Sequence, residues 1–139
     1  MQTWKKRSIL GACLAVFLGW IVWICVAITN EPAEGADSLT ALRDDARTAV
    51  QGEDAEHLQR LFDEDSVADD YAETFIDRLK DADALNADLV LEKREKTSYL
   101  VVKGNNRDGA AVCTPWMVTT KDSRWYLDGT PPTVGDLCQ

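Results

Sequence analysis

The chain has 139 residues, and its 24 acidic and 15 basic side chains give a formal net charge of −9 at pH 7. Residues 31–88 hold 18 acidic and 5 basic side chains, whereas residues 89–139 hold 6 and 7. Such an acidic surface repels phosphate backbones, so the composition argues against a nucleic-acid partner.

Residues 9–28 carry no charge and are mostly apolar. At about 1.5 Å per residue, a helix of that length spans roughly 30 Å, the thickness of a bilayer's hydrocarbon core. We therefore predict a transmembrane helix over 9–28, in contact with the lipid bilayer, after a basic tag at 1–8. Basic residues Lys5, Lys6 and Arg7 flank only the N-terminal side, which predicts a single-pass protein of the cell membrane with a cytoplasmic N-terminus and an extracytoplasmic C-terminal domain.

Two further interpretations of this segment stay open. A cleaved secretory signal has an apolar core of about 7–15 residues and a small-residue exit site. The run here is longer and offers only Cys25-Val26-Ala27 as an exit, so a secreted domain is the alternative to an anchor. Within the span, Gly11, Ala15 and Gly19 share one helix face, which could pair with a second copy or another membrane protein; such residues are also simply frequent in membrane helices.

Residues 29–37 include Pro32 and Gly35 and predict a flexible tether. Three amphipathic helices are expected after it, the first capped by Asp37 or Ser38, the second opened by Glu53 and Asp54 and the third beginning at Ser66.

From Ala87 the apolar period changes from helical to two, which indicates strands. We expect four of them, at residues 87–92, 98–103, 110–120 and 124–128. A tight hairpin at Asp122-Ser123 would pair Trp125 with Thr120 and turn Trp116 and Trp125 toward the helices. Residues 38–139 are thus predicted to form one α+β domain, with three helices packed on a curved, antiparallel four-stranded sheet.

Cys113 and Cys138 are the cysteines outside the predicted span, and their expected compartment is oxidising. A disulfide between them would stabilise the domain by about 3 kcal/mol in the chain-entropy model. Two free thiols are the alternative.

The helix order, the junction Gly52-Glu53-Asp54-Ala55 and the closing strand Arg124-Trp125-Tyr126-Leu127 resemble the superfamily named after nuclear transport factor 2. The resemblance covers about residues 37–130. In that superfamily a bent sheet wraps the helices into a cone with a pocket inside, and membrane-anchored members, including Mce-associated proteins of actinobacteria, have the same order of tag, span, tether and cone. Such a pocket could be lined by Tyr71, Phe75, Trp116 and Trp125, although aromatic residues at these periods also fit a plain core.

No catalytic, metal or cofactor motif is found in the sequence. His57, the one histidine, has no nucleophile or ligand set spaced around it, and the acidic run from Asp63 lacks the Gly and Glu of a calcium loop at Ala68 and Thr74. The charge run Glu92–Lys96 is interpreted as a solvated strand end.

We therefore expect a non-catalytic accessory, scaffold or ligand-binding domain, held at the membrane, that binds another protein or a small apolar ligand. The alternative is an isomerase or dehydratase with a cone pocket, as in enzymatic members of the resembled superfamily. That alternative requires a carboxylate beside Tyr71 and an interior that is not filled.

Overall fold

The computed structural model describes residues 2–29, 33–133 and 136–138, and it describes the side chains of residues 13–26, 33–133 and 136–138. The chain divides into two compact units, residues 1–32 and 33–139, and each is described by itself.

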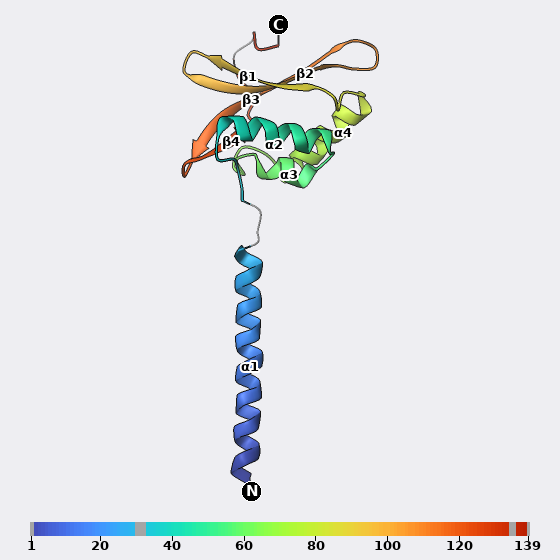
Figure 1. The fold of residues 1–139 in the computed structure, drawn as a ribbon. Helices are drawn as coiled ribbons and strands as arrows, with labels where there is room; N and C mark the ends of the chain where they lie inside the picture. Colours follow the sequence, from blue (N-terminus) through green and yellow to red (C-terminus); the bar gives the residue numbers. More distant parts are fainter. Residues whose placement is uncertain (1, 30–32, 134–135, 139) are drawn as a thin grey trace. The chain divides into compact units, whose positions relative to one another are not determined.

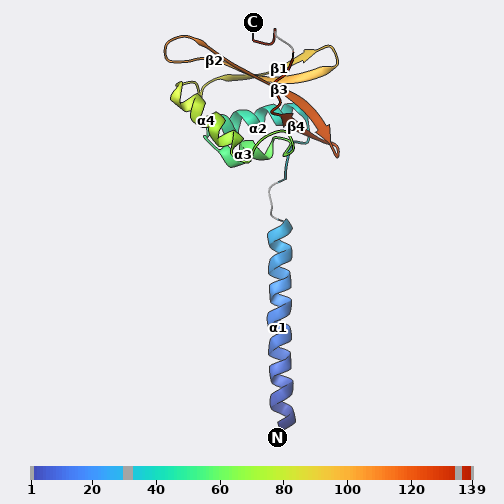
Figure 2. The same ribbon diagram turned by 180° about the vertical axis from the view of Figure 1, so that it is seen from behind.

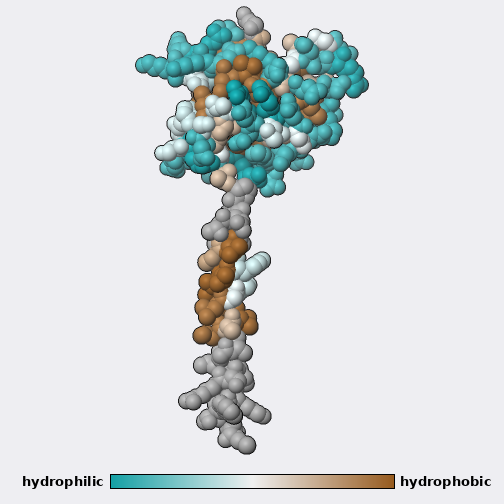
Figure 3. Space-filling model, viewed as in Figure 1, coloured by the Kyte–Doolittle hydropathy of each residue, from teal (hydrophilic) through white to brown (hydrophobic). Residues whose placement is uncertain are grey.

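The first unit contains the helix α1 (Gln2–Thr29). Its large side chains are exposed, including Phe17 at 60%, Trp20 at 62% and Trp23 at 68%, and Figure 3 shows hydrophobic side chains along this part of the helix. Within the part of the chain that the structure describes, no helix has both the length and the hydropathy that a membrane span requires. Of the predicted pairing face, Ala15 and Gly19 are described, whereas the side-chain environment of Gly11 lies outside the described residues.

The second unit, which we call the C-terminal domain, is α+β, as predicted. Its helices are α2 (Leu39–Gln51), α3 (Ala55–Arg60) and α4 (Tyr71–Asp81), and its strands are β1 (Asp88–Arg94), β2 (Thr97–Asn105), β3 (Ala111–Lys121) and β4 (Arg124–Asp128). The four strands form one antiparallel sheet in the order β1-β2-β3-β4. The helices lie on one face of this sheet (Figures 1 and 2).

The helix starts follow from local capping, with one correction. Ser38 caps α2 through its side-chain oxygen, which accepts from the Ala41 amide at 3.1 Å. The third helix of the domain, α4, begins at Tyr71, so its predicted start at Ser66 was wrong. The Ser66 hydroxyl instead donates to the Asp63 carbonyl and accepts from the Gly129 amide, which ties this residue into the loop before the helix.

The β3–β4 hairpin confirms the predicted register. Thr120 pairs with Trp125 and Lys121 pairs with Arg124, so the turn consists of Asp122 and Ser123. Both turn residues have positive φ, 51° and 66°, the backbone of a two-residue turn whose twist matches the flanking strands. This register places Trp116, Val118, Trp125 and Leu127 on the face toward the helices.

The opposite face of the sheet carries a second, smaller core. The predicted disulfide between Cys113 and Cys138 is present, with Cα atoms 5.7 Å apart. It holds the C-terminal tail against the sheet, so that Leu137 is only 1% exposed beside Tyr99 and Val101.

The end of the predicted tether at 29–37 is part of the C-terminal domain. Ala36 forms an isolated bridge with Trp125 and is 2% exposed. The Arg124 guanidinium donates to the carbonyls of Glu34 and Gly35 and to the Asp37 carboxylate. Gly35 has φ +65°, and a Cβ there would lie 2.8 Å from the Trp125 carbonyl oxygen, so only glycine allows this close approach. Residues 34–37 therefore pair with the edge of β4.

Candidate functional site

Three of the four aromatic residues predicted to line a pocket come together between the helices and the sheet. Tyr71, Phe75 and Trp116 form an aromatic cluster with Phe62, with ring centroids 4.8–6.4 Å apart. The Trp116 indole Nε1 donates to the Tyr71 hydroxyl at 2.9 Å. Edge-to-face contacts of this kind add to the stability that burial supplies.

The aromatic cluster is tightly packed. Trp116 is 1% exposed and Phe75 4%, and no polar or charged residue is buried among the described residues. The partner that the structure gives to the Tyr71 hydroxyl is an indole N–H, a donor that does not ionise near neutral pH and so cannot serve as a general acid or base. The described contacts therefore place no acid or base beside Tyr71.

Trp125, the fourth residue, lies apart from the aromatic cluster. It lines a hollow of about 510 Å³ at the end of the sheet. We call this the hairpin hollow; its lining residues are Lys93, Lys96, Thr97, Ser98, Met117, Val118, Thr119, Thr120 and Trp125.

The register explains why a hollow lies there. Lys93 pairs with Ser98, and Thr120 pairs with Trp125. By strand alternation these residues share the helix-facing side with the buried Leu100. The β1–β2 and β3–β4 hairpins project at the same end of the domain in both ribbon views (Figures 1 and 2). Thr97, Met117 and Thr119, which also line the hollow, alternate to the opposite side of the sheet. The pairing of β2 with β3 ends at Tyr99 and Met117, so the hairpin hollow is the notch between the two hairpins beyond that pair, with a lining from both faces of the sheet.

The polar side chains of the hairpin hollow form no hydrogen bonds or ion pairs with the described residues. Neither Lys93 nor Lys96 forms an ion pair there, and the Trp125 indole N–H and the hydroxyls of Ser98 and Thr120 form no hydrogen bonds with those residues. Of the twelve basic side chains after residue 32, eight do form ion pairs with described residues. The two lysines of the hollow are thus two of the four that form none with these residues, and the other two are Arg47 and Arg78.

Three of the neighbouring charges are engaged with one another or with Asp136, whereas Glu95, in the turn between the two lysines, forms no ion pair with the described residues. Lys103 donates to the Glu92 carboxylate, and this hydrogen bond lowers the pKa of Glu92. Arg94 lies between Glu92 and Asp136, at 3.4 and 3.7 Å. Because Glu92 alternates with Lys93 along β1, this ion-pair network lies on the face of the sheet opposite to Lys93, and neither lysine of the hollow is part of it.

Lys93 and Lys96 were not predicted as candidate site residues, because the whole charge run was interpreted as a solvated strand end. The alternation of Lys93 with Leu89 and Leu91 was a usable signal, because it places Lys93 on the apolar, helix-facing side. No sequence pattern could show that the helices stop short of it.

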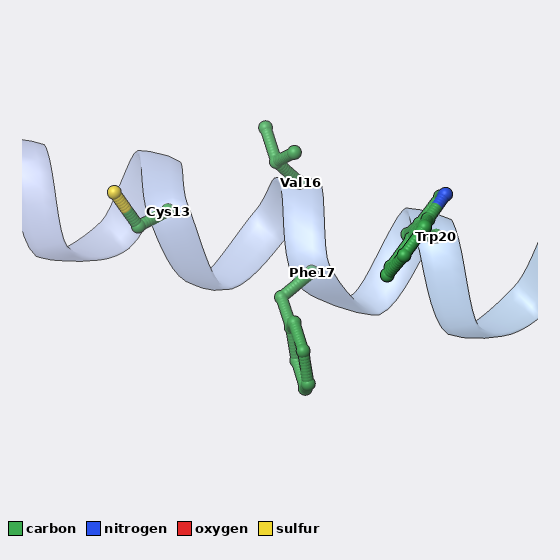
Figure 4. Close-up of a pocket in the computed structure, with 4 residues that line it drawn as sticks. All are labelled: Cys13, Val16, Phe17 and Trp20. Carbon is green, nitrogen blue, oxygen red and sulfur yellow. The ribbon is translucent and has the colours of Figure 1, made fainter.

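A second hollow lies along α1. Cys13, Val16, Phe17 and Trp20 line it, and Figure 4 shows their side chains projecting from successive turns of one helix. Phe17 points to a different side from the other three (Figure 4). This is a surface groove of a single helix.

The remaining hollows described here are acidic and adjoin α3. One is lined by Ala55, Glu56, Gln59, Asp69 and Glu73. Within the described parts of the chain, no group of three or more His, Cys, Asp or Glu side chains could hold a metal ion. The hairpin hollow is therefore the candidate site with unengaged donors.

In comparisons with known proteins, no family model, curated protein or solved structure matches this chain.

Proposed function

We propose that this protein is a single-pass membrane protein whose C-terminal domain is a non-catalytic binding module, with the hairpin hollow as its binding site. The proposed binding role is supported by hydrogen-bond donors in the hollow that have no partner among the described residues: two ammonium groups, an indole N–H and hydroxyls. They lie beside the apolar surface of Val118 and Trp125. Recognition sites combine an apolar surface with a few convergent polar groups in this way.

Binding is favoured over catalysis by the interior of the domain. The isomerase or dehydratase alternative needs a carboxylate within hydrogen-bond reach of Tyr71. The Tyr71 hydroxyl instead accepts from Trp116, in a cluster whose rings pack against one another. We propose an accessory or scaffold role at the membrane on this basis.

The membership of the cone-shaped superfamily is likewise a proposal. It is supported by the helices on one face of an antiparallel four-stranded sheet and by the aromatic cluster between the two layers. A cone of this type would have its mouth at an end of the sheet, where the hairpin hollow lies.

The proposed anchor rests on the uncharged run 9–28, its basic N-terminal flank and the exposed apolar side chains of α1. Alkaline carbonate extraction of membranes from expressing cells tests it. The full-length chain should stay with the membranes, and an impermeant maleimide should label Cys113 and Cys138 in intact cells after reduction.

The matched control for this experiment is a double variant, Leu18→Arg with Ile21→Arg, because a charge at the centre of a span costs about 2.5–3.5 kcal/mol on insertion scales. This variant should lose membrane retention. A wild-type chain of full mass that is extracted by carbonate would contradict the anchor, and a mature chain beginning at Ile28 would support the secreted alternative.

A further inference from the structure

We infer that the hairpin hollow binds an organic anion: a phosphate or carboxylate group joined to a flat, apolar body. This inference rests on the proposed binding function and names the chemical class of its ligand. It goes beyond the small apolar ligand expected from the sequence.

The charge of the ligand follows from the two lysines. Lys93 and Lys96 line the same hollow and have no ion-pair partner among the described residues, although the chain is rich in acidic side chains. Of the two glutamates of this segment, Glu92 is paired with Lys103 and Arg94, and Glu95 is exposed in the turn and pairs with neither lysine. Two unneutralised ammonium groups beside one hollow favour an anion and disfavour a neutral or cationic ligand.

The number of donors favours an oxyanion. Besides the ammonium groups, the Ser98 and Thr120 hydroxyls and the Trp125 indole N–H lie at the hollow without a hydrogen-bond partner among the described residues. Phosphate and carboxylate oxygens accept several such hydrogen bonds at once, and charge assistance makes these bonds shorter and stronger than neutral ones.

The apolar body follows from the base of the hollow. Val118 is 9% exposed and Trp125 is half-buried against the core, so both present apolar surface beside the donors. Aromatic faces bind flat groups by stacking. A bare inorganic anion would use the donors and leave this surface uncovered.

The test uses the full-length chain in a non-ionic detergent, with its tryptophans labelled with ¹⁵N. The indole resonances are followed by NMR, and that of Trp125 is assigned with Trp125→Phe. The probes share one body and differ in charge: phenyl phosphate, benzoate, benzyl alcohol and benzylammonium, with inorganic phosphate as a fifth. Phenyl phosphate should shift the Trp125 resonance, should leave that of Trp116 unmoved, and should bind at least tenfold more tightly than benzyl alcohol.

The variants Lys93→Gln and Lys96→Gln should each weaken binding of phenyl phosphate by about tenfold, the loss expected for one charge-assisted hydrogen bond. Arg78→Gln is the matched control. Arg78 is exposed on α4, it has no ion pair with the described residues, and it is outside the hollow, so its removal should change the affinity less than twofold.

The anion could come from a soluble molecule or from a lipid headgroup, and bilayer discs distinguish these sources. A Trp125 shift in discs with phosphatidylglycerol, relative to phosphatidylcholine alone, would support the ligand class with a lipid source. A shift only with added phenyl phosphate would support it with a soluble source.

Two results would overturn the inference in distinguishable ways. Equal binding of benzyl alcohol and phenyl phosphate at Trp125, or equal affinities for Lys93→Gln and Arg78→Gln, would reject the anion and leave the hollow as a binding site. A Trp125 resonance that no probe shifts at millimolar concentration would reject both the anion and the hollow.

Discussion

The aromatic cluster and the hairpin hollow both adjoin the four-stranded sheet, yet they differ in whether their polar side chains are hydrogen-bonded. In the cluster, the indole N–H of Trp116 donates to Tyr71 and the ring is 1% exposed. In the hollow, the indole N–H of Trp125 has no partner among the described residues, and its neighbours Lys93 and Lys96 are exposed.

This difference teaches how one sheet can serve two purposes. Where the helices cover the face, burial requires that every polar group be paired, since an unpaired buried group costs about 1–3 kcal/mol. Where the helices end, water satisfies the donors, and they stay available to a ligand. Substitutions in the cluster should therefore cost stability, whereas substitutions in the hollow should cost binding.

The largest expected effect is that of Trp116→Ala. Removing this fully buried ring should lower the free energy of unfolding by about 3–5 kcal/mol, through lost burial and the cavity left behind. The matched variant Trp125→Ala should cost roughly 1–2 kcal/mol, because that ring is partly exposed. Urea denaturation of the full chain measures both, and equal losses would break the comparison.

The disulfide should have the next largest effect. Reduction, or Cys113→Ser with Cys138→Ser, should destabilise the domain by about 3 kcal/mol, because it frees the closed loop and the tail that buries Leu137. The control is Cys13→Ser with Cys25→Ser, which leaves the bridge intact. Thermal unfolding with and without reductant measures the difference, and an unchanged midpoint in the reduced protein would contradict the predicted role of the tail.

Tyr71→Phe removes a single atom, the hydroxyl oxygen that accepts from Trp116, and so tests whether the buried polar groups of the cluster must be paired. It leaves the Trp116 indole N–H buried without an acceptor, so the free energy of unfolding should fall by about 1–3 kcal/mol. Tyr126→Phe is a suitable control, since no hydrogen bond to its hydroxyl is found among the described residues. Similar stabilities of the two variants in chemical denaturation would show that the Tyr71 hydroxyl contributes nothing to the cluster.

The smallest effect concerns the exposed ion pair beside the hollow. Lys103 lowers the pKa of Glu92, so their pair stabilises the fold above the ordinary pKa of a glutamate, about 4.3, and this contribution is lost as the pH falls through the lowered value. Lys103→Gln should therefore unfold at a slightly lower temperature than the wild type at pH 7, and the gap should close by about pH 3. A gap that widened in acid would contradict this assignment.

Much of the domain could be predicted from the sequence because local patterns determine it. The cap at Ser38, the turn at Asp122-Ser123 and the pairing of Thr120 with Trp125 all follow from residue type and period. The disulfide between Cys113 and Cys138 followed from the compartment expected for them.

The features that were missed depend on tertiary contacts. Ser66 caps no helix because its hydroxyl is used by Asp63 and Gly129, which is 63 residues away in the chain. The docking of residues 34–37 depends on Arg124, almost ninety residues later. Lys93 and Lys96 line the candidate site beyond the last pair of β2 and β3, Tyr99 with Met117, and a period of two cannot show where the pairing of two strands stops.

The most direct test of the account is the hydrogen exchange of two indole N–H groups, those of Trp116 and Trp125, in the ligand-free full-length chain. The account predicts that the Trp116 resonance exchanges slowly, at a rate set by opening of the domain, and that the Trp125 resonance exchanges with water orders of magnitude faster. Comparable protection of the two groups would mean that Trp125 is as enclosed as Trp116, and it would contradict the open, unengaged hollow on which the proposed binding function depends.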